Sequence, residues 1–414
     1  MGSVIGAYGD RQIQVYTDGG IITLIRDLGP ATLTMPRIMP GMVDLHVHSR
    51  QPGGDGKEDW PHLFQAAMRG GVTTVVTMPN TSPPIASLEV LEQARKLAGD
   101  SPLRPLFWFG VTPDNLDQMD QAVQEPDVVG LKLYTGSTTN ALVVSDPVVQ
   151  EQALRLAARR HLPVAAHCVD DAVVGRNLEL LGHDADFADH PIIRDVESQL
   201  APVKRILQLA KRTGCEVLFC HVSTLAAAEA IRQYQRSGGL AWIEFCPHYL
   251  FLDSSLLRTT EAWRFKMNPA LRSRSETEQL WQFFLADQAD TIGSDHAPHT
   301  IAEKTSGSYA DCPSGVPGLQ TTLPLLNDRV WRGELSQRLL VEYTSARPAQ
   351  IIGLSNKGRI ARGAAADLVL VDPTQQTVLE DEAMFYQCGW TPYKGRILRG
   401  RIVSTILGGS HYDV

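Results

Sequence analysis

Two kinds of segment alternate along most of the chain. Short runs rich in Val, Ile, Phe and Leu recur at 42–48, 72–78, 106–111, 128–134, 163–167, 216–221, 240–246 and 291–295. Stretches with helical spacing of apolar residues separate them, among them 87–99, 147–160 and 224–238. A repeated strand with a covering helix predicts parallel strands, and near-continuous apolar strands are typical of a sheet buried on both faces. We therefore predict an α/β fold, a (β/α)8 TIM-type barrel.

The two ends of the chain have a different pattern. Residues 11–38 and about 357–408 contain β-like runs punctuated by glycine, such as QIQVY, GIITLI and GRILRGRIVSTILGG. We predict that residues 1–39 and 357–414 form one small β-subdomain, and that residues 40–356 form the barrel.

Composition and charge narrow the class of protein. Of the 414 residues, 43% are hydrophobic and 20% are charged, which is ordinary for a soluble enzyme. The net charge of −8 argues against nucleic acid as a partner, because phosphate binding needs clustered Lys and Arg. No apolar stretch approaches a membrane span, and the start lacks the pattern of a signal peptide. The six cysteines include no CxxC pair, which favours free thiols. We expect a cytoplasmic protein.

Polar residues interrupt the predicted strands near their carboxyl ends. His46 and His48 close the first strand, and side chains two apart on a strand share a face, so both can bind one ion. Four further candidates fall at the ends of later strands: Lys132, His167, His221 and Asp295. For any one of these histidines taken alone, the common alternative to a metal ligand is a core histidine whose ring is hydrogen-bonded to the backbone. Six such residues at one level of one barrel indicate a metal-dependent active site, with ligand types that favour Zn²⁺.

Lys132 needs a separate explanation, because an ammonium is no metal ligand and its unpaired burial is costly. Reaction with CO₂ would give a carbamate that can bridge two cations. The alternative is a lysine neutralised by a nearby carboxylate such as Asp295. Cys220 and Glu244 also lie on predicted strands here, which leaves a third metal site open. Because Cys220 precedes His221, we expect its thiol on the opposite face, as a buried structural group.

Between about Pro40 and Leu326 the chain carries the motifs PGMVDLHVHSRQPGG, TMPNTSPP, GLKLY, CHVST, CPHYLFL, MNPALRS, GSDHAPHT and GVPGLQTTLPLL. With these motifs the chain resembles the amidohydrolase superfamily, and within it the dihydroorotases, including the domain of the multifunctional animal pyrimidine-synthesis protein. The resemblance implies two zinc ions per chain, bridged by carboxylated Lys132. It assigns His46, His48 and Asp295 to one ion, and His167 and His221 to the other.

The resemblance also implies substrate contacts. Arg50 looks like the arginine that clamps a substrate carboxylate, for which its planar fork is suited. Asn80 and His299 would complete that carboxylate site. The residues implied to face the ring are Asn268, Ser314 and Gly315. Thr138 and Thr139 resemble a loop that closes over the substrate. The family often has an acidic residue where this chain has Gln51, which is not a proposed ligand.

The implied activity is the reversible hydrolysis of (S)-dihydroorotate to N-carbamoyl-L-aspartate in de novo pyrimidine biosynthesis, with Asp295 as the proton shuttle. Hydantoinase (dihydropyrimidinase) and allantoinase are the alternatives, because they share the fold and the metals, yet generally lack an arginine at the position of Arg50. An inactive scaffold homologue is a more remote alternative, since such proteins typically lose metal ligands. The expected partners are the small-molecule substrate and either a second copy of the chain or another pyrimidine-pathway enzyme.

Overall fold

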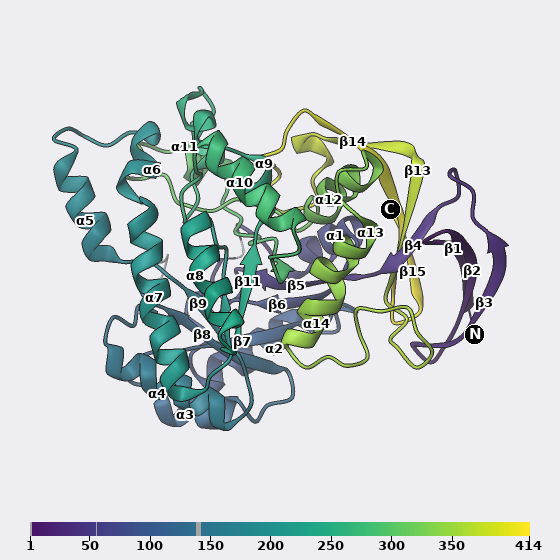
Figure 1. Cartoon of the computed structure of the whole chain (residues 1–414), viewed down its shortest axis with the longest axis horizontal. Coiled ribbons are helices and arrows are strands. Elements are labelled where there is room, and N and C mark those ends of the chain that lie inside the picture. The colour runs from purple at the N-terminus through teal and green to yellow at the C-terminus, as the bar shows by residue number, and fades with distance from the viewer. Residues whose placement is uncertain (1, 55, 138–141) are drawn as a thin grey trace.

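The computed structural model describes residues 2–54, 56–137 and 142–414. Eight parallel strands follow one another in chain order around a barrel (Figure 1): β5 (Met42–Val47), β6 (Val72–Thr77), β7 (Leu106–Gly110), β8 (Val128–Tyr134), β9 (Val164–His167), β10 (Val217–Phe219), β11 (Ala241–Phe245) and β12 (Thr291–Ile292). A parallel bridge between Val47 and His296 brings the first strand beside the segment after the last. Each strand lies within the range that the apolar runs predict, so the predicted barrel is confirmed.

Helices cover the outside of the barrel. The longer ones are α1 (Trp60–Gly70), α2 (Leu88–Ala98), α3 (Leu116–Ala122), α4 (Pro147–Arg159), α5 (Asp171–Leu180), α7 (Val196–Thr213), α8 (Leu225–Arg236), α10 (Arg274–Leu285) and α12 (Thr322–Trp331). The shorter ones are α6 (His190–Ile193), α9 (Pro247–Phe251), α11 (Ile301–Thr305), α13 (Gln337–Val341) and α14 (Arg347–Ile351).

Local sequence explains where these helices begin and which face they bury. In α8, the Thr224 side chain accepts a hydrogen bond from the Ala227 backbone N–H and so caps the first turn. Ala227, Ala228 and Ile231 are buried, a spacing that puts one stripe against the strands. The helices predicted at 87–99, 147–160 and 224–238 are thus confirmed as α2, α4 and α8.

A separate apolar cluster fills the inside of the barrel. It joins Leu45 of β5, Trp108 of β7 and Ala165 of β9, and strands on opposite sides of a barrel can meet only through its interior. The Trp108 Nε1–H donates to the Leu45 carbonyl at 2.8 Å, which satisfies the one polar atom of that side chain. Ala349 and Ile351 of α14 belong to the same cluster. The barrel interior is therefore a packed core, and in barrels of this kind the site lies at the carboxyl ends of the strands.

Both ends of the chain build a second sheet, in the order β15-β14-β13-β4-β1-β2-β3. Its strands are β1 (Gly2–Tyr8), β2 (Arg11–Asp18), β3 (Ile21–Pro30), β4 (Arg37–Pro40), β13 (Leu368–Leu379), β14 (Arg396–Leu407) and β15 (Ser410–Asp413). The purple and yellow strands lie together beside the barrel (Figure 1), as predicted for a joint β-subdomain. β1 lies before the range that the sequence marks as β-rich. The domain bounds at 39/40 and 356/357 stay a prediction.

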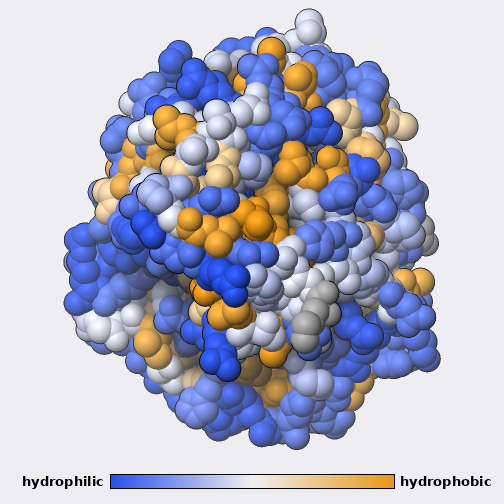
Figure 2. All heavy atoms as spheres, turned by 90° about the vertical axis from the view of Figure 1, so that its right-hand side faces the viewer, coloured by the Kyte–Doolittle hydropathy of each residue, from blue (hydrophilic) through white to orange (hydrophobic). Residues whose placement is uncertain are grey.

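The side of the molecule that carries this terminal sheet exposes apolar residues. Figure 2 looks onto that side and shows hydrophobic residues grouped among hydrophilic ones. Those exposed on β1 and β3 are Ile5, Tyr8, Ile21, Leu24 and Leu28.

All six cysteines are buried free thiols, as predicted. In the described part of the chain, every helix is too short or too polar to cross a membrane.

Candidate active site

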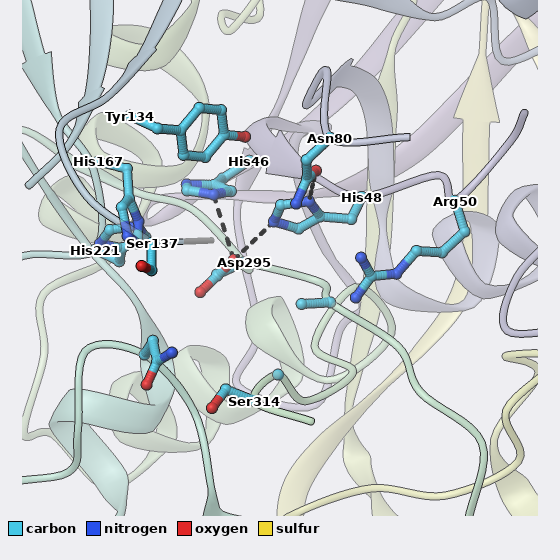
Figure 3. Close-up of a pocket in the computed structure, with 13 residues that line it drawn as sticks. His46, His48, Arg50, Asn80, Tyr134, Ser137, His167, His221, Asp295 and Ser314 are labelled. Atoms are coloured by element: carbon cyan, nitrogen blue, oxygen red, sulfur yellow. Dashed lines mark hydrogen bonds and ion pairs between the residues drawn. The ribbon is translucent and has the colours of Figure 1, made fainter. Parts of the chain in front are cut away.

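A pocket with an empty volume of about 530 Å³ opens at the carboxyl ends of the barrel strands (Figure 3). It is lined by His46, His48, Arg50, Asn80, Tyr134, Ser137, His167, His221, Asn268, Asp295, Ala297, Ser314 and Gly315. Every described residue that the sequence proposes for the site therefore lines it, except Lys132 and His299, which lie behind its wall. Thr138 and Thr139 lie outside the described residues.

His46, His48 and Asp295 bring three lone-pair atoms together. His46 Nδ1 donates to Glu244 Oε1 at 2.7 Å, and His48 Nδ1 donates to Asn80 Oδ1. Because those oxygens accept, each ring keeps its proton on Nδ1 and presents an unprotonated Nε2. Both Nε2 atoms face Asp295 Oδ1, at 3.3 Å from His46 and 3.2 Å from His48 (Figure 3). Three lone-pair atoms this close repel one another unless a proton or a metal ion lies between them, and their ligand types fit a metal ion.

His167 and His221 form a second pair of facing imidazoles. His167 Nδ1 lies 2.8 Å from His221 Nε2, and two such nitrogens share either a proton or a cation. The other ring nitrogens, His167 Nε2 and His221 Nδ1, are buried without a hydrogen-bond partner among the described residues. Burial lowers the pKa of both rings, and of His46 and His48, well below the usual value. All four are neutral, which is the form that binds metals.

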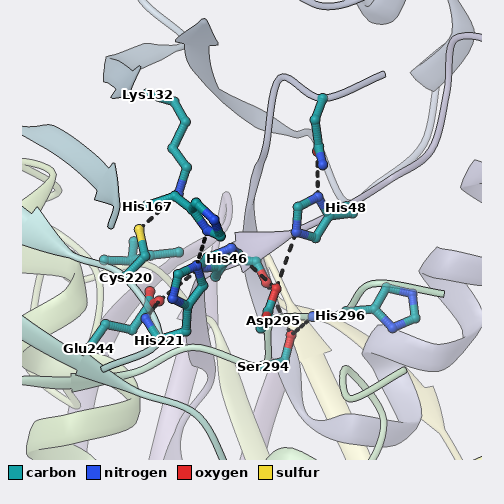
Figure 4. A network of polar contacts seen from close by, with 12 residues as sticks. His46, His48, Lys132, His167, Cys220, His221, Glu244, Ser294, Asp295 and His296 are labelled. Carbon is teal, nitrogen blue, oxygen red and sulfur yellow. Dashed lines mark hydrogen bonds and ion pairs between the residues drawn. The ribbon is translucent and has the colours of Figure 1, made fainter. Parts of the chain in front are cut away.

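Lys132 lies beneath these ligands and is wholly buried. It is two residues before the end of β8, not at the end as predicted. Its Nζ donates to Cys220 Sγ at 2.9 Å (Figure 4). Among the described residues it forms no ion pair, so the structure offers no support for neutralisation by Asp295 or another carboxylate. Burying the charged form of this amine without a counter-ion is costly.

Cys220 is buried, as expected, but its predicted place on the face opposite His221 was wrong, because its thiol faces Lys132 inside the barrel. β10 ends at Phe219, and His221 has a left-handed φ of 39°. The alternation of a strand is therefore lost, and two consecutive side chains both turn inward. Cys220 lies with His46 and Glu244 in a group whose ligand atoms are all within 4.8 Å of one another. The donor types suit a metal ion, and a third metal site stays open.

Left-handed backbone recurs at the pocket. Arg50 and Asp295 have φ values of 61° and 44°, in addition to His221. Non-glycine residues rarely adopt this conformation, and where they do it often accompanies a functional constraint. Each of the three follows a barrel strand and turns a polar side chain into the pocket.

Arg50 brings an unpaired positive charge to the pocket. Its Nε donates to the Pro298 carbonyl at 3.0 Å and its Nη2 to His299 Nε2 at 3.2 Å. His299 must then carry its proton on Nδ1, and burial lowers its pKa to about 3, so it is neutral. Burial lowers the pKa of Arg50 to about 10, which leaves it charged at neutral pH. Among the described residues it has no carboxylate partner, so an anion in the pocket would supply the missing charge.

The opposite wall is made of Asn268, Ser314 and Gly315. The Asn268 Oδ1 is buried and has no hydrogen-bond partner within the described ranges. Gly315 has a φ of 137°, and a Cβ there would lie 2.7 Å from the Ala297 carbonyl oxygen, so only glycine fits. The buried Lys304 Nζ donates to the Gly315 carbonyl at 3.1 Å and to those of Lys266 and Pro313.

Sequence reasoning missed Tyr134, Ser137 and Ala297 as lining residues. The strand spacing could have revealed Tyr134, because it follows Lys132 by two and so shares its face. It also missed the partner of His296, whose Nε2 lies 3.0 Å from the buried Glu58 Oε2.

Comparisons with known proteins agree with this architecture. The sequence profile of the amidohydrolase family matches residues 37–409. A dihydroorotase from Halobacterium salinarum is 35% identical over 364 residues, which are 87% of this chain and 83% of that protein. An allantoinase from Deinococcus radiodurans is 33% identical over 414 residues, 97% of this chain and 91% of that protein. The solved L-hydantoinase (dihydropyrimidinase) from Arthrobacter aurescens has a TM-score of 0.90 at 24% identity, over 97% of this chain and 92% of that one, a likeness of fold.

Proposed function

The chain belongs to the amidohydrolase family, and from this membership we propose that it is a dihydroorotase, which reversibly hydrolyses (S)-dihydroorotate to N-carbamoyl-L-aspartate. The similarity to dihydroorotases over most of the chain supports this proposal. The reaction belongs to pyrimidine synthesis in the cytoplasm, where a second copy of the chain or another enzyme of that pathway is the proposed partner.

The observation that carries the proposal is the buried, unpaired charge of Arg50 in the pocket wall. Dihydroorotate has a ring carboxylate that this guanidinium can bind through two parallel hydrogen bonds. Hydantoin, dihydrouracil and allantoin have no such carboxylate, and with them Arg50 would stay without a counter-ion. Since a buried unpaired charge is costly, the pocket favours the carboxylate-bearing ring.

The donor set fits metal ions, and we propose that two zinc ions bind. His46, His48 and Asp295 would hold one and His167 and His221 the other, with carboxylated Lys132 between them. Imidazole and carboxylate ligands suit Zn²⁺. When bound, such ions polarise the amide carbonyl and lower the pKa of water.

The residues of the chain would then have separate roles in the reaction. Arg50 holds the ring carboxylate and so fixes where the amide lies, while Asn268, Ser314 and Gly315 face the ring. Asp295 accepts a proton from the attacking water and delivers it to the leaving ring nitrogen. In the direction of ring closure, Asp295 removes the proton from the ureido nitrogen instead.

A side-by-side assay tests the proposed function. Zinc-loaded protein is given dihydroorotate, hydantoin, dihydrouracil and allantoin, and the metal-free protein serves as the blank. We expect the highest kcat/KM with dihydroorotate, and ring closure of N-carbamoyl-L-aspartate at lower pH. A higher kcat/KM with allantoin would indicate an allantoinase, like the Deinococcus relative. A higher kcat/KM with hydantoin would indicate a hydantoinase.

A further inference from the structure

Tyr134 is a pocket residue to which the proposed function assigns no role. It is the last residue of β8 and lines the pocket, with only 2% of its surface exposed. Its hydroxyl nevertheless has no hydrogen-bond partner in the described part of the chain. Buried hydroxyls are nearly always bonded, so an orphaned one that faces a pocket points to a missing ligand atom.

The ring of Tyr134 is held on the side of the metal-ligand candidates. Its centroid lies 5.5 Å from that of His167 and 5.1 Å from Lys132 Nζ. Figure 3 shows the hydroxyl pointing away from His167, across His46 and toward Asn80. With the ring beside His167 and Lys132, the hydroxyl lies on the side of the metal-ligand candidates, whereas Arg50 lies on the other side of the same view.

At that end, groups that can donate a hydrogen bond are scarce. His46 and His48 turn their unprotonated nitrogens to the centre, and Asp295 is an acceptor when ionised. A phenol has an ordinary pKa of about 10 and is a hydrogen-bond donor at neutral pH. The Tyr134 hydroxyl can thus supply a neutral donor at an end of the pocket where His46, His48 and Asp295 present lone pairs that suit a metal ion.

We propose that the Tyr134 hydroxyl donates a hydrogen bond to the oxygen of the scissile amide as that oxygen becomes negative during hydrolysis. This inference rests on the proposed function for the identity of the amide. The proton stays on the phenol oxygen throughout, so the contact changes no bond. A fixed donor aimed at a charge that forms only in the transition state raises kcat more than it lowers KM.

The test is Tyr134→Phe, which keeps the ring beside His167 and Lys132 and removes only the hydroxyl. We expect the single-turnover rate with dihydroorotate to fall about 10²–10³-fold, as when one oxyanion donor is lost, with KM, zinc content and Tm close to those of the wild type. The matched control is Tyr343→Phe, whose buried hydroxyl donates to the Phe284 carbonyl away from the pocket. It should leave the rate unchanged.

Two results would overturn the inference. In one, the rate of Tyr134→Phe stays near that of the wild type while its zinc content is normal. In the other, only KM rises, and only with dihydroorotate, which would place the hydroxyl at the ring carboxylate. A wild-type protein that prefers hydantoin or allantoin would instead refute the proposed function. Tyr134→Phe can then be measured on that substrate, because the amide oxygen becomes negative in every ring opened by hydrolysis.

Discussion

His46 and Glu244 form a wholly buried pair in which the imidazole Nδ1 lies 2.7 Å from the carboxylate Oε1. The same oxygen accepts the backbone N–H of His221 at 3.0 Å. One carboxylate thus orients ligand candidates from two different parts of the barrel, β5 and the segment after β10. Partners of this kind fix the tautomer of a metal-binding histidine.

Glu244→Gln should therefore weaken zinc binding by about 10–100-fold, the usual loss when such a partner is removed. Titration of the loaded protein with a chelator measures the loss. The matched control is Glu58→Gln, which changes an equally buried carboxylate beside His296, a histidine with no proposed metal. That control should lower stability and leave zinc affinity unchanged. Equal zinc affinity in Glu244→Gln and the wild type would mean that the pair has no part in metal binding.

Lys132→Ala should lose both the proposed bridge between the metals and the activity. A short carboxylic acid supplied with zinc should restore part of the activity, because it offers the two oxygens that the carbamate would provide. The matched control is Lys304→Ala, which removes the other wholly buried lysine and which no carboxylic acid should rescue. Elemental analysis of active wild-type protein should find two zinc ions per chain. One ion, or an unmodified Lys132 by mass spectrometry, would refute the binuclear proposal.

Asp295→Asn keeps the size of the side chain and a metal-facing oxygen but cannot accept a proton. It should bind zinc and substrate and turn over about 10²–10⁴-fold more slowly, the usual worth of general acid–base help. In the wild type, hydrolysis should fall away in acid as Asp295 is protonated, whereas ring closure should be favoured there because it consumes a proton. Full zinc content with near-normal turnover in Asp295→Asn would place the proton shuttle on another group.

His190 gives a pH prediction that is independent of the metals. Burial lowers its pKa to about 3, while its ring bonds the Met267 carbonyl and the Tyr309 hydroxyl. Below the unfolded value of 6.5 the unfolded chain takes up a proton that the folded chain refuses, so stability falls as pH drops from 6.5 toward 3. One such group contributes a slope of about 1.4 kcal/mol per pH unit.

His190→Gln should flatten the acid side of the stability curve by about one proton, measured by urea unfolding of metal-free protein between pH 4.5 and 7. His183→Gln is the control, because His183 is exposed and its pKa is raised by the Leu181 carbonyl and by Asp189. The contribution of His183 to the pH dependence of stability therefore has the opposite sign, so His183→Gln should not flatten the acid side of the stability curve. An unchanged slope in His190→Gln would show that His190 also titrates in the folded protein.

The strands could be predicted because burial on both faces leaves an apolar run that the sequence shows directly. Every residue of β5, β6 and β8 is buried. β1 was missed because three of its seven residues, GSVIGAY, are Gly or Ser, and its burial does not alternate regularly. The positions of the metal-ligand candidates followed from the strand ends, since parallel strands of a barrel present those ends on one face.

Contacts that depend on backbone detail could not be predicted. The inward turn of Cys220 follows from the left-handed φ of His221, which no sequence pattern marks. The pairing of Glu58 with His296 joins residues 238 positions apart, and neither position signals the other. The hydrogen bond from Arg50 to His299 was not predicted either. The resemblance placed both residues at a substrate carboxylate, whereas in the structure His299 lies behind the guanidinium and outside the pocket lining.

Arg50→Met decides whether the unpaired charge in the pocket selects the substrate. The variant removes the guanidinium and keeps an apolar side chain of similar length, while Arg50→Lys keeps a charge without the planar fork and serves as its control. Folding and zinc content are verified first by Tm and elemental analysis.

The most direct measurement is the ratio of kcat/KM for dihydroorotate to that for hydantoin, in wild type and Arg50→Met. Loss of a buried charged partner costs several kcal/mol, so the ratio should fall by about a hundredfold or more, with Arg50→Lys in between. Equal losses on both substrates would show that Arg50 only supports the fold, and would contradict the proposal that this pocket is built for dihydroorotate.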